Sequence, residues 1–164
     1  MVSATDNSLS SLHIERKLEI AAPIQTTFEA LLEQIGPGST LPDGTPLPMK
    51  LEAWPGGRWF RDLGENAGHL WGHVQVIKPP ALIEIIGPLF MSYPVMSHVQ
   101  YRLIEKGDAT TLQFLHRATG HIDPSHAENV VPGWEYILEQ VKQRAEHQFK
   151  RTVNNLLQTK PGDD

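Results

Sequence analysis

The chain of 164 residues contains no cysteine, and this absence excludes several kinds of chemistry. Disulfide bonds, thiolate metal sites, iron–sulfur clusters and cysteine nucleophiles all need the missing thiol. The chain also lacks an apolar run close to the roughly 20 residues of a membrane-spanning helix, so we expect no membrane insertion. Its first eight residues have neither the basic nor the apolar part of a signal peptide, and we therefore expect a cytoplasmic location.

Basic residues are the scarcer charged class, with 14 Lys and Arg against 19 Asp and Glu, for a net charge of −5. A general nucleic-acid binder needs a basic surface that displaces counterions from phosphates. The charge balance therefore argues against nucleic acid as a partner. A hydrophobic content of 40% and this length are typical of one globular domain.

Hydrophobic periodicity predicts the first two elements. Apolar and polar residues alternate from His13 to Ile20, which is typical of a strand with one buried face. Apolar residues then recur at helical spacing from Ile24 to Ile35, and this helix should end at Gly36. Residues 36–48 are rich in Gly and Pro, so they should form a long irregular loop.

A series of short strands follows, separated by connections of hairpin length, and favours one antiparallel meander. The predicted strands are residues 49–54, 58–63, 70–77, 81–86, 96–104 and 110–118. The last element is a long amphipathic helix that we expect to open at Pro132-Gly133, with an apolar stripe from Trp134 to Leu157. An antiparallel sheet needs cover for its apolar face, and this helix supplies it.

These elements predict a single domain of residues 13–158, preceded by a flexible arm of residues 1–12 and followed by a flexible tail of residues 159–164. A long helix across a curved sheet commonly leaves space underneath. We expect the ligand site in that space.

Four local motifs in this order resemble a known family. They are Pro55-Gly56-Gly57-Arg58-Trp59, then Gly72-x-Val74 with Lys78-Pro79-Pro80, then Thr110-Thr111-Leu112-x-Phe114-x-His116, and finally Gly133-Trp134. The chain is similar from His13 to about Leu157 to the START-like (SRPBCC) helix-grip superfamily, in the branch named after the activator of the heat-shock-protein-90 ATPase. The resemblance implies an α+β fold in which a curved antiparallel sheet of six to seven strands wraps around a long C-terminal helix. Relatives usually have a second short helix where residues 36–48 stand, so the pocket opening is expected to differ.

The superfamily resemblance leaves the function open, because its members include lipid carriers, hormone receptors, polyketide aromatases and cyclases, and co-chaperone domains. We expect a protein that binds a small hydrophobic or aromatic molecule between sheet and C-terminal helix. The alternatives are a cyclase- or aromatase-type enzyme that uses the same cavity, and a chaperone-modulating interaction module. The sequence shows no Ser-His-Asp order, nucleophile elbow or phosphate loop, which favours binding over catalysis.

Large side chains on the predicted inner face are the candidates for contact with such a ligand, because aromatic residues suit planar or lipid-like molecules. The eight candidates are Trp59, Trp71, Phe90, Tyr93, Phe114, His116, Trp134 and Leu138.

His116 shares a strand face with Leu112 and Phe114 and admits three interpretations. It could bond a polar group of a ligand, act as a general base, or be a core histidine satisfied by a backbone carbonyl or a tryptophan. We assign no catalytic residue and expect no cofactor. We also expect no metal site, because His69 and His73 would lie ~13 Å apart on a strand.

Residues 87–97 carry Leu89, Phe90 and Met91 between two prolines and contain no charge. Proline limits pairing in a central strand, so this segment should be an edge or a loop. If its apolar side chains are exposed, they mark a pocket rim or the contact of a homodimer. A buried, well-packed strand start is the alternative.

Overall fold

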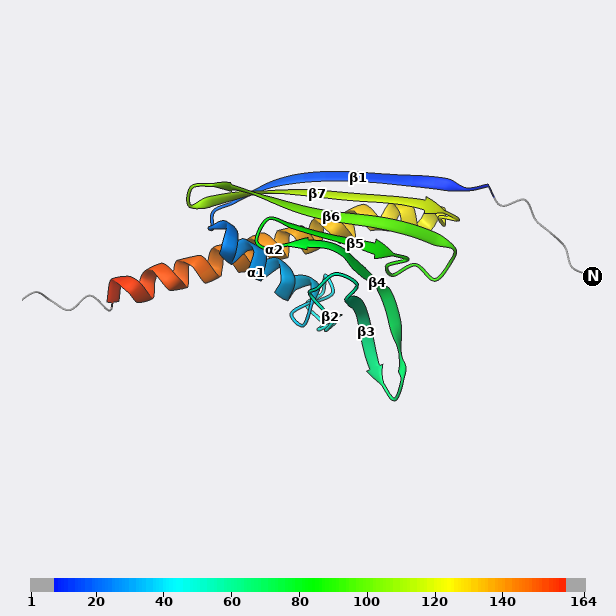
Figure 1. The fold of residues 1–164 in the computed structure, drawn as a ribbon, viewed down its shortest axis with the longest axis horizontal. Helices are drawn as coiled ribbons and strands as arrows, with labels where there is room; N and C mark the ends of the chain where they lie inside the picture. The colour runs from blue at the N-terminus through cyan, green and yellow to red at the C-terminus, as the bar shows by residue number, and fades with distance from the viewer. Residues whose placement is uncertain (1–7, 159–164) are drawn as a thin grey trace, which may run out of the picture.

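A computed structural model describes residues 8–158 of the chain. The elements are β1 (Ser10–Ile20), α1 (Ile24–Ile35), β2 (Lys50–Leu51), β3 (Arg58–Gly64), β4 (Ala67–Lys78), β5 (Leu82–Gly87), β6 (Val95–Lys106), β7 (Ala109–Gly120) and α2 (Pro124–Gln158). The strands form one antiparallel sheet in the order β1-β7-β6-β5-β4-β3-β2. This curved sheet with its long C-terminal helix confirms the predicted helix-grip fold (Figure 1).

Strand β1 forms one edge of the sheet and confirms the one-sided burial predicted from its alternation. Ile14 and Ile20 lie in the core, whereas their charged neighbours along the strand face solvent. The strand begins at Ser10, inside the predicted arm of residues 1–12, because it pairs with the end of β7 from that residue onward. Residues 1–7 of the arm and the predicted tail of residues 159–164 lie outside the described residues.

Strands β4 and β5 approach each other closely at a pair of glycines. A Cβ added at Gly72 would lie 2.5 Å from the carbonyl oxygen of Ile86, and a Cβ at Gly87 would lie 2.5 Å from the Cα of Gly72. Real Cβ atoms essentially never approach a backbone atom so closely. The glycine of the Gly72-x-Val74 motif therefore permits the pairing of these two strands.

Helix α2 begins at Pro124, so the predicted start at Pro132-Gly133 is wrong. Asp123 precedes the helix, and its Oδ1 accepts a hydrogen bond from the backbone N–H of Ser125 at 2.8 Å. A capping carboxylate followed by proline is a strong helix start, because the first turn leaves its N–H groups without helical partners. Pro132 instead lies inside the helix, where it removes one backbone hydrogen bond without ending the helix.

Helix α2 crosses the apolar face of the sheet with α1 packed beside it (Figure 1). Its buried stripe includes Trp134, Leu138 and Ala145. The C-terminal part of α2 extends past the sheet (Figure 1), and residues 151–158 are exposed. The predicted stripe is therefore buried only in its first part, and Leu157 is 68% exposed. No described helix combines the length and apolar character that a membrane crossing needs.

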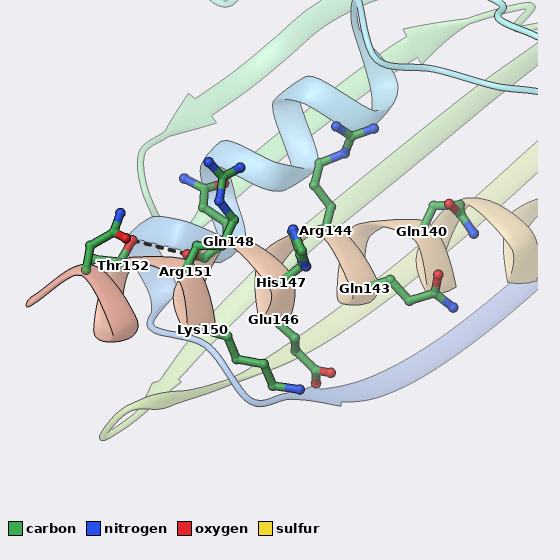
Figure 2. A pocket seen from close by; sticks show the side chains of 10 residues that line it. Gln140, Gln143, Arg144, Glu146, His147, Gln148, Lys150, Arg151 and Thr152 are labelled. Atoms are coloured by element: carbon green, nitrogen blue, oxygen red, sulfur yellow. Dashed lines mark hydrogen bonds between the residues drawn. The ribbon is translucent and has the colours of Figure 1, made fainter. Parts of the chain in front are cut away.

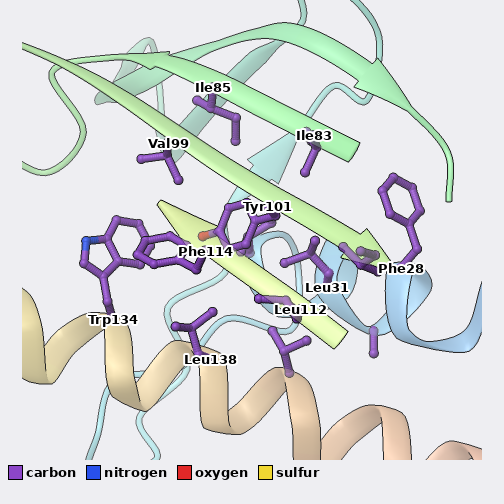
Figure 3. Close-up of a cluster of buried hydrophobic side chains, with 14 of the residues drawn as sticks. Phe28, Leu31, Ile83, Ile85, Val99, Tyr101, Leu112, Phe114, Trp134 and Leu138 are labelled. Carbon is purple, nitrogen blue, oxygen red and sulfur yellow. The ribbon is translucent and has the colours of Figure 1, made fainter. Parts of the chain in front are cut away.

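Aromatic side chains fill the centre of the space between sheet and α2 (Figure 3). The ring centroids of Phe114 and Trp134 lie 4.8 Å apart, and those of Tyr101 and Phe114 lie 5.1 Å apart. All three rings are buried. Because Leu138 packs in the same cluster, this central region has the close packing of a protein core and not the form of a cavity.

Residues 88–94 connect β5 to β6, so the prediction of a loop is confirmed for this part of the segment, whereas Gly87 and residues 95–97 belong to β5 and β6, which are inner strands and not edge strands. Leu89 and Met91 are buried, whereas Phe90 is half-buried and Met96 is exposed. With Leu89 and Met91 inside the molecule, most of the apolar surface proposed for a homodimer contact is already covered. The dimer itself stays a prediction.

Substitution of Gly72 by alanine should lower the free energy of unfolding by roughly 1–3 kcal/mol, because the new methyl group forces the Ile86 carbonyl away. Gly133→Ala is the matched control: a Cβ there meets no atom within 4 Å, and alanine favours a helix by up to about 1 kcal/mol over glycine. Urea unfolding of both variants measures these changes. A Gly72→Ala protein as stable as the wild type would contradict the close approach of the strands.

Candidate functional site

A cavity of about 210 Å³ lies between the sheet and the first half of α2, next to the end of α1. It is lined by Gln34, Ile35, Ser39, Thr40, Leu41, Pro42, Leu47, Trp59, Trp71, Phe90, Asn129, Val130, Gly133, Trp134, Tyr136 and Ile137. Most of these side chains are apolar, and three are indoles. The lining therefore suits an apolar occupant that meets a small number of polar groups.

Three aromatic rings from the sheet side form a continuous wall of the cavity. Trp71 of β4 is central: its ring lies 5.0 Å from Trp59 and 5.8 Å from Phe90, in edge-to-face geometry in both cases. Trp59 belongs to β3, and Phe90 to the loop after β5. Edge-to-face contacts are favourable between aromatic quadrupoles, so the rings hold one another in place.

The indole N–H groups of the three tryptophans in the lining differ in their partners. Trp59 donates to the carbonyl oxygen of Ile35 at 2.7 Å, and Trp134 donates to Nδ1 of His116 at 3.0 Å. The Nε1 atom of Trp71 is buried and has no acceptor among the described residues. Two indoles are thus satisfied by the fold and the third is not.

Residues 36–48 cover the cavity, and we call them the lid. They form the irregular loop predicted from sequence, with a single β-bridge between Thr40 and Pro46. The hydroxyl groups of Thr40 and Tyr136 lie 2.8 Å apart and join the lid to α2. Leu41 is exposed yet lines the cavity, so the cavity reaches the surface at the tip of the lid.

Gln34 is a buried polar residue of the lining that the sequence analysis did not identify. Its Oε1 accepts hydrogen bonds from Nε and one terminal nitrogen of Arg144, at 3.3 and 3.0 Å, and Arg144 also donates to the carbonyl of Gly38 at 3.1 Å. The Nε2 atom is buried without an acceptor among the described residues. The available signal was its helical position three residues after Leu31, on the buried face of α1.

His116 lies in the core with both ring nitrogens bonded. Because an indole N–H can only donate, Nδ1 accepts from Trp134, and Nε2 carries the proton and donates to Oγ of Ser97 at 3.0 Å. Burial, aided by the charge of His98, lowers the pKa of His116 to about 4. Of the three interpretations offered by the sequence, this geometry matches the core histidine bonded to a tryptophan.

The structure brings four of the eight predicted contact residues to the cavity. Trp59, Trp71, Phe90 and Trp134 line it, whereas Tyr93, Phe114, His116 and Leu138 do not. Phe114 and Leu138 belong to the core beside Trp134 (Figure 3). Tyr93 stacks on His126 with ring centroids 5.4 Å apart, and its hydroxyl lies 3.0 Å from Nδ1 of that histidine. Contact with a ligand stays a prediction for the four lining residues.

A larger hollow, of about 950 Å³, runs along the second half of α2, but its side chains do not converge. Figure 2 shows Arg144 directed toward α1, whereas Glu146 and Lys150 point to the opposite side of the helix. These groups form a polar helix surface and not an enclosed site. Among residues 8–158, no three His, Asp or Glu side chains gather as metal ligands would.

Replacement of His116 by phenylalanine should destabilise the protein by about 1–3 kcal/mol at pH 7, because the indole N–H of Trp134 and the hydroxyl of Ser97 both lose a buried partner. Chemical denaturation measures the difference. An unchanged free energy of unfolding would contradict the structural role.

The stability gained from His116 should also depend on pH. Its pKa is about 4 when folded and about 6.5 when unfolded, so the unfolded chain takes up the proton first on acidification. The wild type should therefore lose stability relative to His116→Phe as the pH falls from about 6.5 toward 4, by roughly 3 kcal/mol over the full range. A difference that stays constant with pH would show that the folded histidine titrates normally.

Comparison with known structures supports the same fold. A protein of Rhizobium leguminosarum aligns with 85% of this chain and 99% of its own, at 17% identity and a TM-score of 0.61. CalU16 from Micromonospora echinospora aligns over 85% of this chain and 83% of its own, at 23% identity and a TM-score of 0.54. DynU16, a protein of the dynemicin biosynthetic locus, aligns over 82% of this chain and 47% of its own, at 16% identity and a TM-score of 0.56.

At these identities the structural neighbours establish the fold and leave the function open. No curated protein matches the sequence. Residues 21–146, which include α1, the lid and most of the sheet and of α2, match the family described as activator of Hsp90 ATPase homolog 1-like protein. The motifs that suggested this branch lie within the matched range. The chain therefore belongs to the activator of Hsp90 ATPase homolog 1-like (AHSA1) family.

Proposed function

We propose that this protein binds a small apolar molecule in the cavity between the sheet, the lid and α2. The observation that carries the proposal is the aromatic wall of Trp59, Trp71 and Phe90, which faces a cavity of about 210 Å³. Binding of an apolar molecule in a cavity with this lining is favourable, because it removes apolar surface from water.

The cavity volume limits the size of the ligand. An apolar cavity of ~150 Å³ holds benzene, so about 210 Å³ suits one aromatic ring with a small substituent. A long-chain lipid of the kind carried by other START-like proteins would need the lid to move. The proposal is therefore narrower than the hydrophobic or aromatic ligand expected from sequence.

The lid gives the ligand a route to the cavity. Its base is held by the hydrogen bond from the N–H of Met49 to the carbonyl of Gly36 and by the contact of Arg144 with Gly38. Its tip, which includes Leu41, is exposed. Loops with an anchored base and an exposed tip open locally at low free-energy cost, so we expect entry beneath the tip.

The alternatives considered from the sequence receive less support. A cyclase- or aromatase-type enzyme would use His116 as acid or base, but that histidine is bonded in the core and does not line the cavity. The family description names an activator of the Hsp90 ATPase, which keeps a chaperone-modulating role as the second candidate. The cytoplasmic location and the homodimer stay predictions alongside both.

Filling the cavity should abolish binding. Val130 is buried on α2 and lines the cavity, so in Val130→Phe the new ring occupies ligand space. We expect α-methylstyrene, a one-ring hydrocarbon, to bind the wild type, and its affinity to fall at least about tenfold in the variant, since the lost burial of a ring exceeds 1.4 kcal/mol. An NMR titration measures the dissociation constants.

Val153→Phe is the matched control, because it makes the same change on the exposed part of α2 and should leave binding unaltered. If Val130→Phe does not fold, Ser39→Phe tests the cavity from the lid side, with the same loss expected. Binding that survives in a folded, filled variant would place the ligand elsewhere. A wild type that binds none of toluene, styrene and α-methylstyrene would contradict the proposal.

A further inference from the structure

Two residues of the cavity lining each carry a buried hydrogen-bond donor without a partner. The donors are Nε2 of Gln34, a side chain that is 1% exposed, and Nε1 of Trp71. Neither has an acceptor among residues 8–158. Buried N–H groups without partners are rare in folded proteins, because the group loses its hydrogen bond to water and forms no new one. Two of them in the lining of one cavity call for an explanation.

The other two indoles of the lining differ from Trp71, because the fold supplies each of them with an acceptor. Trp59 and Trp134 each donate to a protein acceptor within 3.0 Å. The third buried orphan of the described residues, the hydroxyl of Tyr101, is in the core and does not line the cavity. Gln34 and Trp71 are therefore the two lining residues whose buried donors the described protein leaves without an acceptor.

The amide of Gln34 is oriented by Arg144. The guanidinium donates twice to Oε1, and a cation cannot accept a hydrogen bond from Nε2. A flip of the amide would put its NH₂ group against the charged donors of Arg144. The Gln34 side chain thus presents a donor, and not an acceptor, as its unused group.

We propose that the ligand is a neutral carbonyl compound about the size of one substituted ring, whose oxygen accepts hydrogen bonds from the donors of Gln34 and Trp71. This inference rests on the proposed function, because it places the ligand in the same cavity. A carbonyl oxygen has two lone pairs and no proton, which matches a lining that offers donors.

The ligand is neutral because the cavity provides no direct counterion. Arg144 contacts Gln34 but is not itself part of the lining. A carboxylate moved from water into the cavity would lose its hydration without a paired cation, and that transfer is strongly unfavourable. The geometry thus favours a ketone, aldehyde, ester or amide over an acid anion.

The test compares acetophenone with α-methylstyrene, which replaces the carbonyl oxygen by a CH₂ group at nearly constant shape. Their dissociation constants, measured by NMR titration, should favour acetophenone by about three- to tenfold in the wild type, the range expected from one net hydrogen bond. Benzoate, which carries a charge on the same scaffold, should bind more weakly than either.

Two variants remove the donors one at a time. Gln34→Glu keeps an oxygen for Arg144 and replaces the NH₂ by an acceptor, so the preference for acetophenone should disappear or reverse. Trp71→Phe keeps an aromatic ring and removes the indole N–H, so the preference should shrink. Gln75→Glu, which adds the same charge at an exposed position of β4, is the control and should keep it.

Binding of α-methylstyrene tests the proposed function alone, whereas the preference for acetophenone over it tests the role of the donors. If α-methylstyrene and acetophenone bind the wild type equally, the proposed apolar site stands and the role of the donors is overturned. A preference that persists in both variants would overturn the role as well. If neither compound binds, the proposed function fails and this inference fails with it. Should Gln34→Glu not fold, the ratio measured in Trp71→Phe still decides.

Discussion

Trp134 fixes the position of α2 on the sheet, and the rest of the structure depends on that contact. Its ring packs 4.8 Å from Phe114, and its indole N–H donates to His116, which in turn donates to Ser97 on the neighbouring strand β6. The same side chain also lines the cavity. Core packing and the candidate site therefore share one residue, and a shift of α2 would alter both.

The space beneath the sheet is divided into a filled centre and an open end. Tyr101 and Phe114 project from β6 and β7 and fill the centre beneath the helix (Figure 3). Toward β3 and β4 the sheet contributes Trp59 and Trp71, and the lid covers the opening where α1 ends. A loop in this place closes the cavity with a small number of hydrogen bonds, so access depends on local opening of the lid and not on movement of α2.

Local patterns in the sequence sufficed for the fold and for part of the site. Alternation located β1 and short connections separated the later strands, but Pro132 does not mark the start of α2, because the capping pair at Asp123 lies upstream. Alternation also put His116 on the inner face. It could not tell whether a helix or a ligand covers that face, since both bury a residue equally. Gln34 was missed because its role depends on Arg144, which is distant in sequence.

Intermolecular NOEs between α-methylstyrene and protein methyl groups test the central claim most directly, because they locate the ligand within the fold. The account predicts contacts to Leu47, Val130 and Ile137, from the lid and the first half of α2. Contacts instead to Leu112 and Leu138 would place the ligand beneath the centre of the sheet, where the structure has a packed core, and would contradict the account.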